Sequence, residues 1–230
     1  CRKTTEIYKR IMELENKIIV LTGSEGLLGR EYTKALSIAG AKVIGWDINN
    51  GIDITKENDI EYATKIILED EGKIDVLINN AAINPTVGGD FSFAPYEDYD
   101  TDLFRKEIEV NLIGMQNCTK HIAKNMIKNK SGVVVNVASE ISVVAHDHRV
   151  YDDINKFKSI GYATTKSAIL GFTRQWAARL GMYGIRVNSF SIGGVQTEGL
   201  DSEFAKRFGN MAFKYGETSA LKLNQDDIIY

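Results

Sequence analysis

The stretch KIIVLTGSEGLLG, residues 17–29, decides the fold: a short apolar run leads into a glycine-rich turn and then into a helical pattern. Gly23 permits a tight bend, Gly26 lets the backbone approach a diphosphate, and Gly29 allows the helix to pack closely on the strand. The N–H groups at the start of the helix favour an anion. The stretch therefore predicts a dinucleotide-binding loop. The alternative is a glycine-rich turn that serves only the fold.

Beyond this loop, short apolar runs alternate with segments of helical period, which is the α/β pattern. The expected strands are residues 17–21, 42–47, 74–79, 132–137 and 185–190. The expected helices cover residues 28–39, 60–67, 104–126 and 169–180. Near-continuous Val, Ile and Leu content is typical of parallel strands that are covered on both faces. The pattern predicts one Rossmann-type, doubly wound parallel sheet with helices on both faces.

Two features depart from a complete doubly wound domain. A short β-like stretch, residues 51–55, begins almost directly after Asp47, although a parallel crossover normally takes a dozen or more residues. Either this crossover is a tight loop or a segment is missing. The chain also stops at Tyr230, where the acidic residues 225–227 would introduce another helix. We therefore expect that a C-terminal helix and an edge strand are missing.

Composition and charge narrow the function classes. With 28 basic and 31 acidic side chains the net charge is −3, so we expect no nucleic-acid partner. Cys1 and Cys118 are read as free thiols, which suits a reducing compartment. No apolar run approaches the roughly 20 residues of a membrane helix, so we expect a cytoplasmic protein with no membrane partner. Residues 1–13 are read as an extension or tag remnant, and residues 14–230 as one dinucleotide-binding domain.

The second expected strand ends at Asp47, 24 residues after Gly23. A carboxylate there can accept hydrogen bonds from the adenosine ribose and repel a 2′-phosphate. Because no Arg or Lys occurs in residues 47–55, the sequence favours NAD over NADP as cofactor. The alternative is that Asp47 is a solvated turn residue.

Four further residues form a candidate catalytic set. Tyr162 and Lys166 are spaced i and i+4 near the start of a helix, so their side chains can approach each other. A phenol with a reference pKa of ~10 needs a nearby cation to act as acid or base at neutral pH. Ser139 ends the fourth expected strand, and Asn111 is a polar residue within an apolar helical stripe. Each of these four residues alone could have a structural role, but the four together indicate a catalytic site.

These motifs together resemble those of a classical short-chain dehydrogenase/reductase, from about Leu14 to Thr197. The motifs are Thr22-Gly23 with the later glycines, Asp53-Ile54, Asn79-Asn80-Ala81-Ala82, and the set of Asn111, Ser139, Tyr162 and Lys166. The resemblance implies that Tyr162 is the general acid/base and that Lys166 lowers its pKa and holds the nicotinamide ribose. It also implies that Ser139 orients the reacting oxygen and that Asn111 supports a proton relay through water.

The loop chemistry and the resemblance together name the expected cofactor contacts. They are Gly23, Ser24, Gly26, Leu28, Gly29, Asp47, Ile48, Asp53, Ile54, Asn80, Ala81, Ala82, Tyr162, Lys166, Gly193, Val195 and Thr197. The implied substrate is a small molecule with a secondary alcohol or ketone. The resemblance also implies a homodimer or a homotetramer.

Three departures from the family pattern qualify the resemblance. The glycines follow TGxxGxxG, a spacing commoner in the extended branch with sugar-nucleotide epimerases and dehydratases, although the Asn-Asn-Ala motif favours the classical branch. Ile192-Gly193 replaces the usual Pro-Gly. Ser139 and Tyr162 are 23 positions apart, about ten more than usual, and the added loop resembles that of reductases linked to surface-polysaccharide and flagellin-glycan sugars.

Within that added loop, His146, Asp147 and His148 have too few further ligands for us to expect a metal. Arg149 and Tyr151 could contact a phosphorylated or sugar substrate, or could only pack the loop.

Two other functions stay open. One is a non-catalytic dinucleotide-binding redox sensor, and the other is an NAD-dependent sugar epimerase or dehydratase, which the glycine spacing suggests. The first expectation is an oxidoreductase that transfers a hydride between NAD(H) and a secondary alcohol or ketone, with a sugar or nucleotide-sugar derivative as a candidate substrate.

Overall fold

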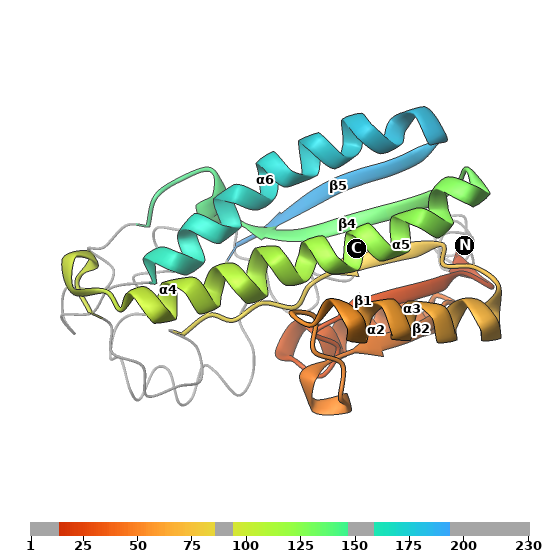
Figure 1. Ribbon diagram of the computed structural model, residues 1–230, viewed down its shortest axis with the longest axis horizontal. Helices are drawn as coiled ribbons and strands as arrows, with labels where there is room; N and C mark the ends of the chain where they lie inside the picture. Colours follow the sequence, from red (N-terminus) through yellow and green to blue (C-terminus); the bar gives the residue numbers. More distant parts are fainter. Residues whose placement is uncertain (1–13, 86–93, 147–158, 194–230) are drawn as a thin grey trace, which may run out of the picture.

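The computed structural model of the protein describes residues 14–85, 94–146 and 159–193 (Figure 1). Within these ranges the chain forms one parallel sheet, as expected. Its strands are β1 (Ile18–Thr22), β2 (Lys42–Trp46), β3 (Val76–Asn79), β4 (Gly132–Ser139) and β5 (Ile185–Ile192). The spatial order is β2-β1-β3-β4-β5. The expectations for residues 1–13 and for a missing C-terminal helix and strand lie outside the described residues.

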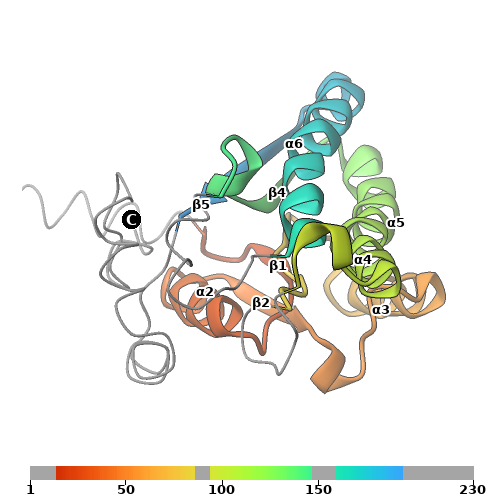
Figure 2. The ribbon, with the colours of Figure 1, turned by 90° about the vertical axis from the view of Figure 1, so that its left-hand side faces the viewer.

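Helices cover both faces of the sheet (Figure 2). Helix α2 (Leu27–Ile38) lies on one face, and α3 (Glu57–Glu71), α5 (Met115–Asn129) and α6 (Ile160–Leu180) lie on the other. The chain moves in one direction from β1 to β2 and in the opposite direction in each later crossover. Because parallel crossovers are right-handed, this reversal places α2 opposite the other helices. The doubly wound Rossmann-type architecture is confirmed.

The core lies between the sheet and the helices α3, α5 and α6. All five residues of β1 are buried, and Leu77 and Val134 at the centre of β3 and β4 are fully enclosed. Ile60 of α3 and Ile122 of α5 pack against them. These β-branched and Leu side chains form strands because both faces of the sheet offer apolar surface, which explains their near-continuous apolar runs.

The reversal of strand order falls between β1 and β3. At such a point the loops after the two strands lead away to opposite faces and leave a crevice at the carboxyl ends of the strands. The loop after β1 begins at Gly23, and the loop after β3 begins at Asn80. The sheet topology therefore places the predicted cofactor loop and the Asn-Asn-Ala motif side by side.

The expected β-like stretch at residues 51–55 is wrong. After β2 the chain forms a 3-10 turn, η2 (Ile48–Asn50), capped by the Asp47 side chain. Gly51 has φ +88°, and the Ile52 N–H donates to the Asp47 carbonyl at 3.0 Å. These bonds close a tight loop that leads directly to α3, so the described residues contain no strand beyond β2, which lies at the edge of the sheet.

The expected long third helix is present, but it is not a regular α-helix throughout. Helix α4 (Thr101–Ile108) continues into a π-helical segment, η4 (Glu109–Gly114), before α5 begins. Gly114 ends this segment where it meets the buried Ile54, since a Cβ on Gly114 would lie 2.6 Å from Ile54 Cδ1. In the described ranges, no helix has the length and apolar content needed to cross a bilayer.

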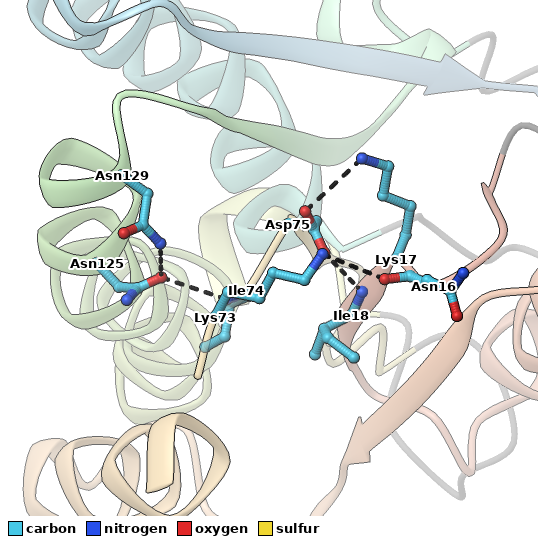
Figure 3. A network of polar contacts seen from close by, with 8 residues as sticks. All are labelled: Asn16, Lys17, Ile18, Lys73, Ile74, Asp75, Asn125 and Asn129. Atoms are coloured by element: carbon cyan, nitrogen blue, oxygen red, sulfur yellow. Dashed lines mark hydrogen bonds and ion pairs between the residues drawn. The ribbon is translucent and has the colours of Figure 1, made fainter. Parts of the chain in front are cut away.

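A polar network lies at the amino ends of the strands, where β1 and β3 begin (Figure 3). The Asp75 carboxylate accepts hydrogen bonds from the Ile18 N–H and from Lys73 Nζ, both at 2.9 Å, with Lys17 Nζ 3.8 Å away. Burial raises the pKa of Asp75, but these partners lower it further, so its net pKa lies below the ordinary value. The carboxylate therefore helps to hold β1 beside β3.

We expect Asp75→Asn to lower the free energy of unfolding by about 1–3 kcal/mol, because the Ile18 N–H and Lys73 lose a charged acceptor. A lowered carboxyl pKa stabilises the fold above the unfolded value and ceases to do so as pH falls. The difference between wild type and variant should therefore shrink below about pH 4. Urea unfolding between pH 3 and pH 7 measures it. The exposed Asp70→Asn is the control, and an equal effect from both substitutions would contradict the assignment.

Candidate active site

The loop after β1 is held in a conformation that requires glycine. Gly23 has φ +67°, and a Cβ there would lie 2.8 Å from the Ala81 Cα. A Cβ on Gly29 would overlap the Gly23 carbonyl, so the first turn of α2 packs directly on the loop. Gly26 is the N-cap of α2, and no side chain caps the helix there. The first N–H groups of α2 are thus available to an anion.

The Asn-Asn-Ala motif after β3 is bound to this loop. Asn80 Nδ2 donates to the carbonyls of Thr22 at 3.0 Å and Gly23 at 3.2 Å. In return, the N–H groups of Asn80 and Ala81 both donate to Thr22 Oγ1 at 3.0 Å. Asn80 and Ala81 therefore join the two walls of the crevice, while Ala82 next to them is exposed. Thr22, which the sequence analysis named in the glycine motif but not among the expected cofactor contacts, is the hub of this contact.

Asp47 lies beside the glycine loop, as the proposed ribose contact requires. Asp47 is 8 % exposed, and its carboxylate accepts hydrogen bonds from the N–H groups of Glu25 and Asn49, both at 3.0 Å. Ser24 packs over Gly45 of β2, where its buried Oγ has no hydrogen-bond partner among the described residues. A glycine cradle, an uncapped helix start and an unpartnered hydroxyl fit a bound diphosphate and ribose.

Three other predicted cofactor contacts do not belong to the glycine loop. They are Asp53, Ile54 and Ile48. The Asp53 carboxylate accepts bonds from Thr55, and chiefly for that reason its pKa is lowered. Ile54 is buried in the core, and its carbonyl accepts a bond from Asn117 Nδ2 at 3.0 Å. Ile48 is 67 % exposed. In this structure Asp53 and Ile54 hold the start of α3 against α5, a packing role that the resemblance did not indicate.

Ser139, Tyr162 and Lys166 meet where β4 ends and α6 begins. Ser139 is the last residue of β4, and its side chain lies close enough to the Tyr162 phenol to act on the phenol pKa. Lys166 Nζ lies 5.6 Å from the centre of the Tyr162 ring and donates to the Val137 carbonyl at 2.6 Å. The predicted phenol, amine and hydroxyl therefore lie together. They lie at the carboxyl ends of the strands, where the glycine loop also lies.

The electrostatics of this group differ from the simplest expectation. Burial raises the pKa of Tyr162 to about 12, although the Ser139 hydrogen bond acts in the opposite direction. Burial also lowers the pKa of Lys166 to about 8. The expected lowering of the phenol pKa by Lys166 is thus absent here. Lys166 is buried and Tyr162 is half-buried, so desolvation dominates, and the amine donates to the Val137 carbonyl rather than to the phenol.

The buried amine should impose a measurable pH dependence on stability. Because the folded pKa of Lys166 lies below the unfolded value, the folded state releases its proton first, and stability rises with pH between about 8 and 10.5. Relative to Lys166→Met, wild type should gain up to about 3 kcal/mol across this range. Urea unfolding of both proteins at pH 7, 8.5 and 9.5 tests this. A pH-independent difference would show that the amine is not desolvated.

Asn111 lies in the π-helical segment and clamps two elements together. Its Oδ1 accepts from the Ile83 N–H at 2.8 Å, and its Nδ2 donates to the Ile83 carbonyl at 3.1 Å and to Thr165 Oγ1 at 3.0 Å. Its amide therefore links the loop after β3 to α6, one residue before Lys166. These bonds use both hydrogens of Nδ2 and one lone pair of Oδ1, so the second lone pair of Oδ1 is the acceptor that the side chain still offers to a water.

Other contacts complete the site, and some predicted residues cannot be placed. Ser142 Oγ accepts from the Ser139 N–H at 3.1 Å and donates to the Lys166 carbonyl at 2.8 Å. Ser139 and Ser142 form a capping box, but the sequence signature of that motif has Glu or Gln at the position of Ser142, so the pattern alone does not identify this residue. Gly193 lies next to Glu140. The predicted contacts Val195 and Thr197, and residues 147–151 of the added loop, lie outside the described residues.

The chain was compared with known proteins. Residues 49–207 match the family described as short chain dehydrogenase. The chain belongs to the short-chain dehydrogenase family. A mitochondrial borneol dehydrogenase from Lavandula x intermedia is 32 % identical over 199 residues, 79 % of this chain and 70 % of that protein. Sorbitol-6-phosphate 2-dehydrogenase from Klebsiella pneumoniae is 29 % identical over 82 % of this chain and 73 % of that protein.

Solved structures agree with this assignment. An NAD⁺-bound xylitol dehydrogenase has a TM-score of 0.73 at 25 % identity, covering 86 % of this chain and 78 % of that one. As a classical short-chain dehydrogenase, the chain is an oxidoreductase of the class that acts on alcohols with a nicotinamide dinucleotide. The parallel sheet described above is the Rossmann-type fold of these proteins.

Proposed function

We propose that this short-chain dehydrogenase transfers a hydride between NAD(H) and a secondary alcohol or ketone, with Tyr162 as general acid/base. The observation that carries the proposal is the meeting of Ser139, Tyr162 and Lys166 at the crevice that the glycine loop also lines. We take residues 14–230 as one dinucleotide-binding domain.

Each residue of the group has a distinct role in this reaction. In the direction of reduction, the Tyr162 hydroxyl donates its proton to the ketone oxygen; in oxidation the phenolate takes the proton back. Ser139, beside Tyr162, orients the same substrate oxygen. Asn111 and Ser142 hold the segment of α6 that carries Lys166. The dinucleotide, when bound, accepts or donates the hydride and adds its own charge beside the phenol.

Lys166 is proposed to act by charge and by a hydrogen bond to the nicotinamide ribose. Its ammonium now donates to the Val137 carbonyl, and with a pKa of about 8 it is still mainly protonated at neutral pH. A positive charge 5.6 Å from the ring of Tyr162 favours the phenolate once the phenol must ionise.

We propose NAD rather than NADP as the cofactor because Asp47 is fixed beside the glycine loop. We expect Asp47→Ser to weaken NAD⁺ binding about tenfold and to reduce the discrimination against NADP⁺. Serine removes the negative charge but can still cap the turn at Asn49. Titration calorimetry with both dinucleotides measures the ratio. An unchanged ratio of the two affinities would contradict the assigned role of Asp47.

For the substrate we propose a sugar or polyol derivative. The sorbitol-6-phosphate and xylitol dehydrogenases are similar to this chain, and the added loop before Tyr162 carries Arg149 and Tyr151, which suit a phosphate or a sugar hydroxyl. Because a borneol dehydrogenase is also similar to this chain, a terpene alcohol is included among the substrates to be tested.

A substrate panel tests the proposed function. Xylitol, sorbitol 6-phosphate, gluconate and borneol are each offered with NAD⁺ and with NADP⁺, and reduced cofactor is followed at 340 nm. We expect turnover of at least one polyol with NAD⁺. Binding of NAD⁺ without turnover of any member, or of the corresponding ketones with NADH, would instead favour a non-catalytic dinucleotide sensor.

A further inference from the structure

A buried carboxyl lies close to the proposed acid/base. Glu107, near the end of α4, is fully enclosed. Its two oxygens contact the Tyr99 hydroxyl at 2.7 Å and Ser159 Oγ at 2.5 Å. The Tyr99 hydroxyl and Ser159 Oγ are themselves 2.8 Å apart. These three side chains close a ring of oxygen contacts.

The ring needs three protons, one for each oxygen contact. The hydroxyls of Tyr99 and Ser159 provide two, and a protonated Glu107 carboxyl provides the third. Burial raises the pKa of Glu107, with the hydrogen bonds from Ser159 and Tyr99 acting against it. Among the described residues no Lys or Arg forms an ion pair with Glu107, so a charged carboxylate there would be buried without a counter-charge. A neutral carboxyl satisfies every contact in the ring.

The ring is attached to the first turn of α6. Ser159 is the N-cap of this helix, and its Oγ accepts a hydrogen bond from the Tyr162 N–H at 2.9 Å. A serine hydroxyl has one proton and two lone pairs, so the ring and the cap together use its full capacity. Glu107 thus sets the direction of the Ser159 hydroxyl, which in turn holds the backbone of Tyr162.

Gly161 is a second, independent sign of the same arrangement. A Cβ at this position would overlap Glu107 Oε2 and would lie 3.2 Å from Phe104 Cδ2. Glycine within a helix costs about 1 kcal/mol relative to alanine. The residue directly before Tyr162 is therefore the one that lets the carboxyl approach the helix backbone.

We propose that Glu107 is a positioning residue for Tyr162: its carboxyl, through Ser159, fixes the first turn of α6 and thereby the phenol relative to Ser139. This rests on the proposed role of Tyr162. Glu107 does not touch the reacting atoms, so it acts only through Ser159 and the helix backbone.

The first test does not depend on turnover. Hydrogen exchange of the whole chain, followed by mass spectrometry, reports on the amide of Tyr162. In Glu107→Ala we expect exchange at residues 160–163 to accelerate at least about tenfold, while amides of β4 keep their rates. Glu107→Gln should restore protection, because its amide offers both a donor and an acceptor to the ring. Unchanged exchange in Glu107→Ala would overturn the proposal.

The second test separates positioning from general stability. With the panel substrate that wild type oxidises fastest, Glu107→Ala should lower kcat about 10- to 100-fold and leave the Kd for NAD⁺ unchanged. Glu107→Gln should recover kcat to within about threefold of wild type. The exposed Glu109→Ala on the same helical segment is the matched control. Equal losses in Glu107→Gln and Glu107→Ala would overturn the proposal.

A double substitution checks the link through Gly161. Gly161→Ala alone should lower kcat, because the new methyl group displaces the carboxyl. In the Glu107→Ala background the same change should have little further effect, and additive losses would contradict the coupling. Tyr162→Phe keeps the two proposals distinguishable. If that variant remains active the proposed function fails, whereas an inactive Tyr162→Phe with a fully active Glu107→Ala rejects only the positioning role.

Discussion

Tyr162→Phe is expected to lower kcat by about 100- to 10,000-fold, the range that a general acid/base contributes. The substitution removes only the hydroxyl beside Ser139 and leaves the half-buried ring in place. Because Tyr162 is also an expected cofactor contact, the Kd for NAD⁺ should rise, but by a much smaller factor than kcat falls. Stopped-flow measurement of NADH formation gives kcat, and quenching of the fluorescence of the two tryptophans gives Kd. The exposed tyrosine Tyr62 provides the matched control, Tyr62→Phe.

The outcome of this comparison separates the candidate functions. A loss confined to Tyr162→Phe supports acid/base chemistry at the end of β4. A Tyr162→Phe enzyme within tenfold of wild type would mean that another group transfers the proton. Copurified cofactor without net NADH release would direct attention to epimerase or dehydratase chemistry, which the glycine spacing left open.

Substitutions in the glycine loop should produce the second large effect, and two neighbouring glycines should respond differently. A Cβ at Gly29 would overlap the Gly23 carbonyl and lie 2.8 Å from the Ser24 Cα, so Gly29→Ala should lower stability by about 1–3 kcal/mol and abolish NAD⁺ binding. A Cβ added at Gly26 would lie 3.3 Å from the Gly23 carbonyl oxygen, and φ at Gly26 is −72°. Gly26→Ala should therefore fold normally.

Cofactor binding reveals the function of Gly26. If the backbone there approaches a diphosphate, the methyl group of Gly26→Ala should weaken NAD⁺ binding at least about tenfold without changing the melting temperature. Gly181→Ala, where an added Cβ meets nothing within 4 Å, is the control. Calorimetry with NAD⁺ and thermal unfolding of all three variants provide the data. An unchanged Kd for NAD⁺ in Gly26→Ala would show that the diphosphate does not bind at this loop.

The arrangement of the strands could be predicted because it depends on local pattern. The apolar runs mark the strands, and the loop after residue 22 marks the start of a helix. Tyr162 and Lys166 could be paired because i and i+4 positions of a helix share a face. Ser139 could be placed with them because ligands of parallel sheets gather at the carboxyl ends of strands.

Other features depend on contacts between distant segments, which a single sequence does not display. The π-helical segment around Asn111 forms where its amide meets Ile83 and Thr165, 28 and 54 positions away. Residues 51–55 have β-like composition, but the bonds of Asp47 and the left-handed Gly51 close them into a loop. The raised pKa of Tyr162 follows from burial, which composition does not reveal.

The Glu107 ring could not be foreseen for the same reason. Glutamate is ordinarily an exposed residue, and nothing near position 107 in the sequence distinguishes it from the exposed Glu109. Its partners Tyr99 and Ser159 are 8 and 52 positions away. Only the packing of α4 against the start of α6 brings them together.

The most direct test of the central claim is a crystal structure of the chain with NAD⁺ bound. It should place the diphosphate against Gly23, Gly26 and Gly29, the adenosine ribose at Asp47, and the nicotinamide ring within reach of the Tyr162 hydroxyl and Ser139. A dinucleotide bound elsewhere, or a nicotinamide ring separated from Tyr162 by other side chains, would contradict the assignment of this crevice as the catalytic site.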